Sequence, residues 1–335
     1  MDTTADTRTA STSAQDLASG RDRIVVAVAD VASCDAALRW SCVEAARDRL
    51  PLQLLHVVPV ELPPSPLRDP DPAVQAAARD RADRELELAA AGLPQPVELL
   101  PPLAVSGPPT TGLLGAVDAH VRLLVIGHRD RTAVQRLLSG STSVATAGRS
   151  PVRVAVVPDG WRPTSSGDVV VGVPLHPTAG HYESDEEVLR EAFVRARATR
   201  LRLVAVTAWN VPPILTWSAT DIERLRGEVL ASLDTVLQPW RDEYPDVEVQ
   251  RHAVAERPVD AVTEAAQTAE IVVVGRHTRA RRHGGFRWGS TCRGVLHHTR
   301  VPVLVVPLAH DEPHQESPGE SATADDDASA WDPMS

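Results

Sequence analysis

The sequence predicts an α/β protein with two tandem doubly wound domains, each a five-stranded parallel sheet of strand order 3-2-1-4-5 with helices on both faces. Three observations lead to this prediction. The chain has 335 residues, more than the ~100–200 that one domain usually holds. Short runs that are apolar at every position alternate with helical stripes, as in parallel sheets covered on both sides. The whole order of these signals then occurs twice, about 150 residues apart, which is a domain-sized repeat.

Each repeat opens and closes on an apolar run that we interpret as a buried strand. Four runs have counterparts: residues 24–28 and 169–173, 52–58 and 201–206, 123–126 and 271–274, and 151–157 and 302–306. The last run of each repeat follows a proline and is rich in valine. An exposed, valine-rich strand at a sheet edge invites pairing with another strand.

The helical segments between the runs also correspond. A first helix follows the first run, and its apolar stripe recurs at helical spacing. The stripe residues are Leu38, Cys42 and Ala45 in the first repeat and Leu189, Phe193 and Ala196 in the second. A longer amphipathic helix follows the second run, and its first copy has a start signal at Asp71-Pro72 and a stop signal at Gly92. A short helix precedes the fourth run.

The composition limits the chemistry, because all 34 basic residues are arginine and none is lysine. A Walker-A lysine, a kinase-type strand lysine and a lysine Schiff base are therefore excluded. Phosphate recognition would have to come from arginine and from backbone N–H groups. We predict no catalytic residues. We also predict no metal site, because His277, His283 and His297-His298 lack a Cys or carboxylate at ligand spacing.

Charge and hydropathy bear on partners and location. Residues 309–335 hold eight acidic residues and no arginine, which leaves 45 − 8 = 37 acidic residues against 34 arginines elsewhere. We therefore expect no nucleic-acid partner. No run approaches about 18–20 apolar residues, and residues 1–20 lack the apolar core of a secretory signal, so we expect a soluble, cytoplasmic protein without a membrane partner. The odd number of cysteines (Cys34, Cys42 and Cys292) indicates reduced thiols.

These patterns divide the chain into five segments. We predict a disordered tail over residues 1–21, a first domain over 22–158, a linker over 159–167, a second domain over 168–308, and an acidic disordered tail over 309–335. The tails are too polar to bury the apolar surface that ordering requires. The linker contains Pro, Gly and Ser, as connectors between packed domains often do.

A glycine-containing loop follows the fourth run of each repeat, where doubly wound sheets place their ligands. The first loop begins at Gly127 and ends in Gly140-Ser141-Thr142; the second begins at Gly275 and ends in Gly289-Ser290-Thr291. Glycine lets the backbone approach a ligand closely. A Gly-Ser-Thr step at a helix start offers N–H groups, hydroxyls and the positive end of the helix dipole to an anion. The same step is also an ordinary helix cap, so both interpretations stay open.

With these loops and its closing Pro-Val strands, the chain resembles the universal stress protein family in its tandem two-domain form, over residues 22–308. The family's loop reads Gly, two residues, Gly, nine residues, Gly, then Ser or Thr. Three phrases elsewhere are also similar to the family: Arg39-Trp40, His56-Val57-Val58 and Tyr244-Pro245-Asp246-Val247. The resemblance implies a doubly wound fold in each half and adenine nucleotide, ATP, as the ligand. It also implies that the last strands of the two domains, residues 152–157 and 301–306, pair with each other and make the chain an internal pseudo-dimer.

The resemblance also implies particular site residues. Family members that bind nucleotide hold ribose and phosphates with the first and third glycines and the hydroxyls that follow, and use an aspartate after the first strand. To these we add Arg129 and Arg276, whose guanidinium groups can bind phosphate through paired N–H donors. The candidate residues are Asp30, Gly127, Arg129, Gly140, Ser141 and Thr142 in the first half, and Gly275, Arg276, Gly289, Ser290 and Thr291 in the second.

The chain departs from the family pattern at two places. Asp130 stands at the middle glycine of the first loop and Thr278 at that of the second, where the next spacing is ten residues instead of nine. Ala29 and Pro174 stand where the family has its aspartate, and Asp30 is a one-residue-shifted substitute. Spacing therefore favours the first half for ATP. Charge favours the second, since Asp130 places a negative charge where phosphates would pass.

Two functions remain open from the sequence. The first is a regulatory stress-response protein that binds ATP in one or both halves, with Mg²⁺ accompanying the nucleotide and at most slow hydrolysis. The second is a nucleotide-free interaction or dimerisation scaffold, whose partners are other proteins or further copies of the chain. A third function, a dedicated enzyme of another nucleotide-binding α/β family, has little support in the motifs.

Overall fold

The computed structural model describes residues 20–59, 72–128, 142–163, 166–174, 186–209, 218–276, 278–280, 286–288 and 290–308. The two predicted disordered tails lie outside the described residues, apart from Gly20 and Arg21. None of the helices in the described ranges has the length and apolar character needed to span a bilayer.

The first half alternates strands and helices. Its elements are β1 (Arg23–Ala27), α2 (Val31–Asp48), β2 (Leu52–Val58), α3 (Pro72–Ala91), β3 (Leu103–Ser106), α4 (Pro109–Gly115), β4 (Val121–His128), α6 (Thr142–Ala147) and β5 (Val154–Pro158). The start of α3 at Pro72 and its end before Gly92 confirm the predicted start and stop signals.

The second half repeats this order. Its elements are β6 (Asp168–Gly172), α7 (Glu186–Thr199), β7 (Leu203–Ala208), α8 (Ala219–Glu243), β8 (Val249–Val254), α9 (Pro258–Ala265), the 3₁₀ turn η2 (Ala266–Thr268), β9 (Ala269–Arg276), β10 (Thr278–Ala280), β11 (Phe286–Trp288), α10 (Ser290–His298) and β12 (Val303–Pro307). Among the described residues, the hairpin of β10 and β11 has no counterpart in the first half.

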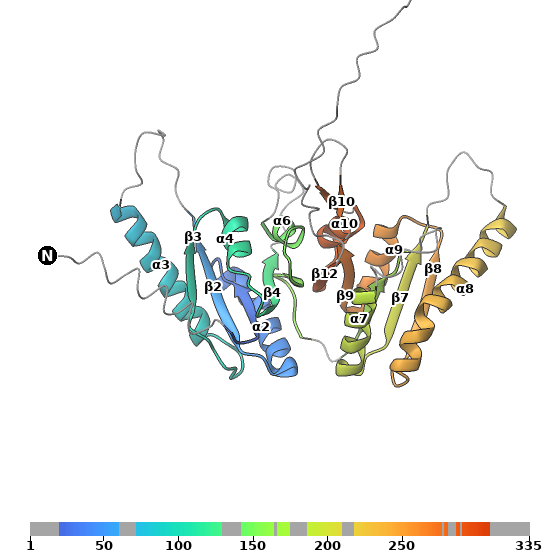
Figure 1. The fold of residues 1–335 in the computed structure, drawn as a ribbon, viewed down its shortest axis with the longest axis horizontal. Coiled ribbons are helices and arrows are strands. Elements are labelled where there is room, and N and C mark those ends of the chain that lie inside the picture. Colours follow the sequence, from blue (N-terminus) through green and yellow to red (C-terminus); the bar gives the residue numbers. More distant parts are fainter. Residues whose placement is uncertain are drawn as a thin grey trace, which may run out of the picture.

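The strands form one continuous sheet in the order β3-β2-β1-β4-β5-β12-β9-β6-β7-β8. Each half therefore contributes five parallel strands in the predicted order 3-2-1-4-5. The two five-stranded sheets are joined into a single ten-stranded sheet, and the strands at its outer ends, β3 and β8, lie beside α3 and α8 at opposite ends of the molecule (Figure 1). The hairpin of β10 and β11 forms a separate two-stranded sheet that the sequence did not predict.

The two halves meet where β5 pairs with β12, and this junction is called the seam below. The pairing is antiparallel, with Val303 opposite Val156, Leu304 opposite Ala155 and Val305 opposite Val154. This confirms the expected pairing of the two closing strands. All three pairs are buried, because helices cover both faces of the sheet at this point.

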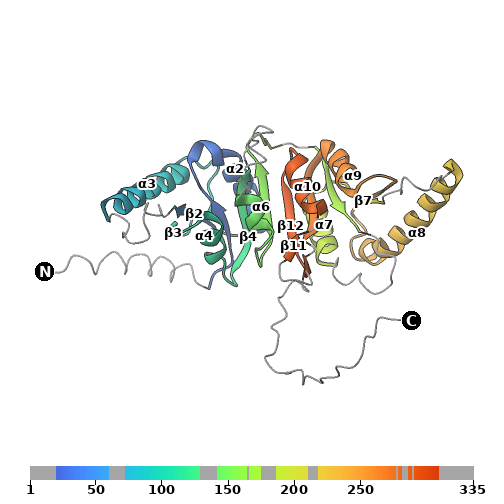
Figure 2. The same cartoon turned by 90° about the horizontal axis from the view of Figure 1, so that it is seen from above.

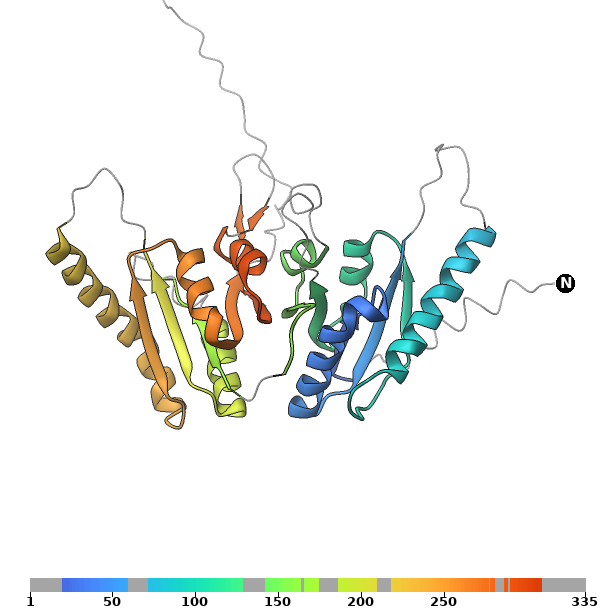
Figure 3. The same cartoon turned by 180° about the vertical axis from the view of Figure 1, so that it is seen from behind.

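The helices lie in two layers, one on each face of the sheet. One apolar core joins the sheet to α2, α3, α7 and α8, and the other joins it to α4, α6, α9 and α10. Both cores run through the two halves without interruption. In the view from above, α2 and α4 lie on opposite sides of the strands of the first half, and α7 and α9 on opposite sides of those of the second (Figure 2). The view from behind shows the same order of elements reversed (Figure 3).

Local sequence explains how the first helix of each half begins and ends. The Asp30 carboxylate caps α2 by accepting a hydrogen bond from the N–H of Ser33, at 2.9 Å. The predicted stripe of Leu38, Cys42 and Ala45 is buried beneath α2. Arg49 and Arg200 follow α2 and α7 with φ of 55° and 58°, the left-handed conformation that commonly terminates helices.

The link between the halves is packed against the protein. Trp161 is only 6% exposed and belongs to the core that contains α2 and α7. Gly167, just before β6, has a φ of +142°, and a Cβ there would lie 2.7 Å from the backbone nitrogen of Glu270. Glycine at this position therefore lets the chain pass close to the start of β9.

Candidate functional site

The two motif glycines lie at equivalent places near the carboxyl ends of β4 and β9. Gly127 is opposite Val157 of β5, and Gly275 is opposite Val306 of β12. β4 is the neighbour of β1 on the side away from β2, so the winding of the first half reverses between β1 and β4, and the second half repeats this arrangement with β6 and β9. Ligands of doubly wound sheets bind outside the strand ends at this reversal.

Packing alone does not require a glycine at position 127. A Cβ added there would lie 3.4 Å from the carbonyl oxygen of Ser33 and 3.8 Å from the Cβ of Ala37, which are ordinary contact distances. The fold would therefore accept alanine. A reason for glycine that does not come from packing is close approach of the backbone to another molecule.

The helices after the two loops begin where the sequence predicted. Thr142 is the first residue of α6, and Ser290 and Thr291 are the first two of α10. The other residues predicted for the loops, Arg129, Gly140, Ser141 and Gly289, lie outside the described residues. α6 contacts β4, and α10 contacts β9, so each half brings its strand-end glycine and its helix start to the same region.

The Asp30 carboxylate lies on the first turn of α2. Beside its bond from the Ser33 backbone, its Oδ2 accepts a hydrogen bond from the Ser33 hydroxyl at 2.7 Å. The backbone N–H groups on either side of Asp30 are also engaged: that of Ala29 donates to Cys34 Sγ at 3.3 Å and that of Val31 to Glu85 Oε2 at 3.2 Å. Helix capping thus accounts for Asp30, and its contact with a nucleotide stays a prediction.

The residue after each motif glycine contacts the opposite half. Arg276, which is 6% exposed, donates from Nη1 to the carbonyl oxygen of Ser150, at 2.7 Å. His128 shares a hydrogen bond of 2.9 Å with the hydroxyl of Ser143 on α6, and its ring lies edge-on to that of His297 on α10, 6.3 Å between centroids. The Arg276 guanidinium is thereby placed at the seam.

His128 is a residue of this region that the sequence analysis missed. Its position directly after Gly127, matching Arg276 after Gly275, was the available signal. What it contacts could not be predicted, because Ser143 and His297 are distant in sequence and are brought to it by helices of two different halves.

The arginine-rich part of the second loop contains the β10–β11 hairpin. Thr278, the residue at the family's middle glycine, pairs with Trp288, and Ala280 pairs with Phe286. A β-branched threonine suits a strand, so the departure from the family pattern at Thr278 falls at the first residue of β10.

Burial shifts the pKa of two groups in the first half, His56 and Cys42. Burial lowers the pKa of the His56 imidazole on β2, whose Nδ1 is buried without a hydrogen-bond partner among the described residues. Burial raises the pKa of the Cys42 thiol to about 11. The three cysteines are all buried, and none of them is in a disulfide. Across the described ranges, no three His, Cys, Asp or Glu side chains come together as ligands for a metal ion.

Comparison with known proteins agrees with this architecture. The fold and the paired strand-end glycines are those of a tandem doubly wound α/β protein, and the sequence pattern of the Universal stress protein family matches residues 20–158 and again 175–307. The chain belongs to the universal stress protein family. A universal stress protein of Mycobacterium tuberculosis strain H37Rv is 30% identical over 295 residues, which are 84% of this chain and 96% of the relative.

Solved structures show the same fold over most of the chain. A universal stress protein from Archaeoglobus fulgidus has a TM-score of 0.56 and 16% identity, and the match covers 86% of this chain and 97% of that one. A protein of Pseudomonas aeruginosa PAO1 described as functionally unknown also has a TM-score of 0.56 and 16% identity. This match covers 89% of this chain and 95% of that one. At this identity the likeness concerns the fold alone.

Proposed function

We propose that this chain is a regulatory protein of the stress response that binds an adenine nucleotide, ATP, at the carboxyl edge of the sheet in one or both halves. The observation that carries the proposal is the duplicated strand-end glycine. Gly127 and Gly275 stand at equivalent places beside the reversal of winding, and packing gives no reason for the glycine at 127.

The chemistry of the proposed site follows from the absence of lysine. Phosphate oxygens would be bound by backbone N–H groups at the starts of α6 and α10, by the hydroxyls there and by loop arginines. Mg²⁺ would accompany the phosphates, and hydrolysis would be slow at most, because the motifs supply no general base or nucleophile. The three buried cysteines, none of them in a disulfide, fit a reducing compartment, so the proposal places the protein in the cytoplasm.

The test is calorimetric titration of nucleotide-stripped full-length protein with ATP, with and without Mg²⁺. Saturable heat with one or two sites per chain, together with thermal stabilisation, supports the proposal. Native mass spectrometry of freshly purified protein then identifies any nucleotide that is retained. No heat and no thermal stabilisation at millimolar ATP would refute nucleotide binding.

Three variants assign the site to a half. Gly140→Glu and Gly289→Glu each place a carboxylate in one loop, where it repels phosphate. Gly227→Glu is the matched control, because Gly227 is exposed on α8 and has open space around its Cα. An affinity that falls in one loop variant and not in the control locates the site. Unchanged affinity in both loop variants would show that the ligand binds elsewhere.

A nucleotide-free scaffold is the second candidate function. Asp30 and Arg276, two of the polar groups expected at the ligand, are both hydrogen-bonded by the chain's own groups. Residues with a structural role are expected to have their polar groups hydrogen-bonded within the protein in this way. This candidate predicts no heat of binding in titrations with any nucleotide. It also predicts that the chain interacts with other proteins or with further copies of itself.

A further inference from the structure

The seam has a local two-fold axis that passes between Ala155 and Leu304. β5 and β12 are equivalent strands of the two halves: each has five residues and ends in Pro158 or Pro307. Aligned from these prolines, Ala155 corresponds to Leu304, and these two residues also lie directly opposite each other in the antiparallel pair. In a two-fold arrangement the residue on the axis faces its own equivalent.

The first helices of the two halves obey the same local symmetry. Arg49 and Arg200 both end their helices in the left-handed conformation, and Leu50 and Leu201 both donate a backbone hydrogen bond of 3.1 Å to the residue five positions earlier. These pairs are 151 residues apart. Glu44 and Arg195 are also 151 residues apart, so they occupy equivalent positions on α2 and α7.

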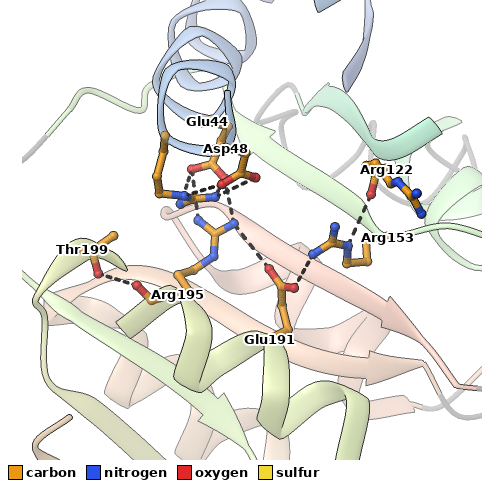
Figure 4. A network of polar contacts seen from close by, with 8 residues as sticks. Glu44, Asp48, Arg122, Arg153, Glu191, Arg195 and Thr199 are labelled. Carbon is orange, nitrogen blue, oxygen red and sulfur yellow. Dashed lines mark hydrogen bonds and ion pairs between the residues drawn. The ribbon is translucent and has the colours of Figure 1, made fainter. Parts of the chain in front are cut away.

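Glu44 and Arg195 face each other across the seam and form a buried ion pair. Arg195 donates from Nη1 to Glu44 Oε1 at 3.0 Å and from Nη2 to Glu44 Oε2 at 2.8 Å. The two residues are 2% and 4% exposed. The close-up shows this pair between the two helices, with the Glu191 and Arg153 ion pair beside it (Figure 4). Arg195 also lies over the ring of Trp40, at 5.6 Å from the centroid.

At both positions the symmetry brings together residues of complementary character. Ala155 and Leu304 are both fully buried, and the small side chain opposes the large one. Glu44 and Arg195 oppose a negative charge to a positive one. If two first halves met in this geometry, alanine would face alanine, leaving a void, and two buried glutamates would oppose each other. If two second halves met, leucine would face leucine and arginine would face arginine.

We propose that these two pairs are the specificity determinants of the seam, which accepts the other half of the chain and rejects a second copy of the same half. Size and charge act independently. Overpacking or a cavity on the axis destabilises a mismatched sheet, and two like charges in a buried position repel and lose their partners. Glu44 also pairs with Arg47, and Arg195 with Glu191, within its own half. Each charge therefore keeps one partner when two copies of the same half meet, and the size pair is needed to complete the discrimination.

The size pair is tested in the full-length chain, where a single substitution reproduces a same-half contact. Leu304→Ala puts alanine opposite alanine and should lower Tm by roughly 5–10 °C. Ala155→Leu puts leucine opposite leucine and should lower Tm by roughly 3–8 °C. The exchange A155L/L304A restores one large and one small side chain and should unfold at a higher temperature than L304A. Leu88→Ala, at a 60% exposed leucine, is the control and should leave Tm nearly unchanged.

The charge pair is tested by reversal and by neutralisation. Arg195→Glu opposes two glutamates and Glu44→Arg opposes two arginines, and each should lower Tm by roughly 6–15 °C. The neutral double variant E44Q/R195Q should lie closer to the parent than either reversal. Arg224→Glu reverses an exposed i,i+4 pair with Glu228 and should change Tm by less than about 2 °C.

The results that would overturn the proposal are distinct for the two pairs. For the size pair, the proposal fails if A155L/L304A lowers Tm by at least the sum of the decreases in the two single variants. Each residue would then matter only to its own half. For charge, it fails if both reversals stay within about 2 °C of the parent. Where a variant gives no folded protein, A155V with L304V, or E44Q and R195Q singly, repeats the comparison with a milder change.

Discussion

Replacement of Gly294 by alanine tests how closely α10 packs on α9. Inside a helix, Gly→Ala by itself stabilises by about 0.5–1 kcal/mol. At Gly294, however, a Cβ would lie 2.7 and 2.8 Å from the two γ-methyl groups of Val259 and 3.3 Å from its Cβ. Because both branches are too close and valine is stiff about χ1, a rotamer change does not relieve the contact.

The helix must therefore move, at the ~1–3 kcal/mol that overpacking usually costs. After subtraction of the helix-propensity gain, we expect Gly294→Ala to destabilise by about 1–2 kcal/mol. Gly227→Ala on α8 is the matched variant, since nothing lies within 4 Å of its added Cβ. It should stabilise by about 0.5–1 kcal/mol. Gly294→Ala should therefore lower the free energy of unfolding relative to the parent, and Gly227→Ala should raise it.

Urea denaturation at constant m-value measures both changes. Val259→Ala provides the rescue, because it removes the two methyl groups that the new Cβ meets. The double variant should therefore lose less than the sum of its two single losses. Equal stabilisation by Gly294→Ala and Gly227→Ala would refute the close-packing argument, as would strict additivity with Val259→Ala.

Three further outcomes are expected. Burial raises the pKa of Cys42 to about 11, and the other two cysteines are also buried, so native protein at pH 8 should not react with a disulfide thiol reagent. The unfolded chain should release three equivalents of the reagent's thiol. Prompt reaction of the native protein would contradict this prediction. The pKa of His56 is lowered by burial, so the folded chain binds fewer protons than the unfolded chain once the pH falls through about 6.5. Stability should be fully present above that pH and decline below it. His56→Gln should flatten the decline in Tm between pH 7 and 5, and an unchanged decline in this variant would contradict a lowered pKa of His56. Asp30→Ala removes the cap of α2 and should cost about 1 kcal/mol of unfolding free energy, whereas Asp30→Asn should retain most of it; equal losses in a urea titration would argue against capping.

The sequence predicted the elements of each half because they depend on local and repeated patterns, and the joining of the halves followed from the family resemblance. Valine-rich runs after Pro151 and Pro302 could be recognised as matching closing strands, and β5 and β12 do pair. Helix limits followed from single residues such as Pro72 and Gly92. The β10–β11 hairpin was missed because its two segments have three residues each and lie among arginines, where no period-two pattern can be read.

The side-chain environment of the candidate site was less predictable. Asp30 follows β1 as expected, but its hydrogen bonds with Ser33 depend on the local path of α2 and could not be predicted. Arg276 was expected to face a phosphate, whereas its guanidinium reaches Ser150 of the other half. Glu44 and Arg195 are ordinary charges in helices when taken one at a time. Their burial becomes evident only once α2 and α7 are brought together across the seam.

Joining the closing strands also determines where the sheet could grow. With β5 and β12 paired to each other, the sheet's open ends in the described part of the chain are β3 and β8. β3 has four residues and so presents few unpaired backbone groups, while β8 carries exposed Gln250 and Arg251. Short or charged borders of this kind discourage another chain from adding a strand. Because the two closing strands pair with each other, neither of them is left as an open edge to which another chain could add a strand.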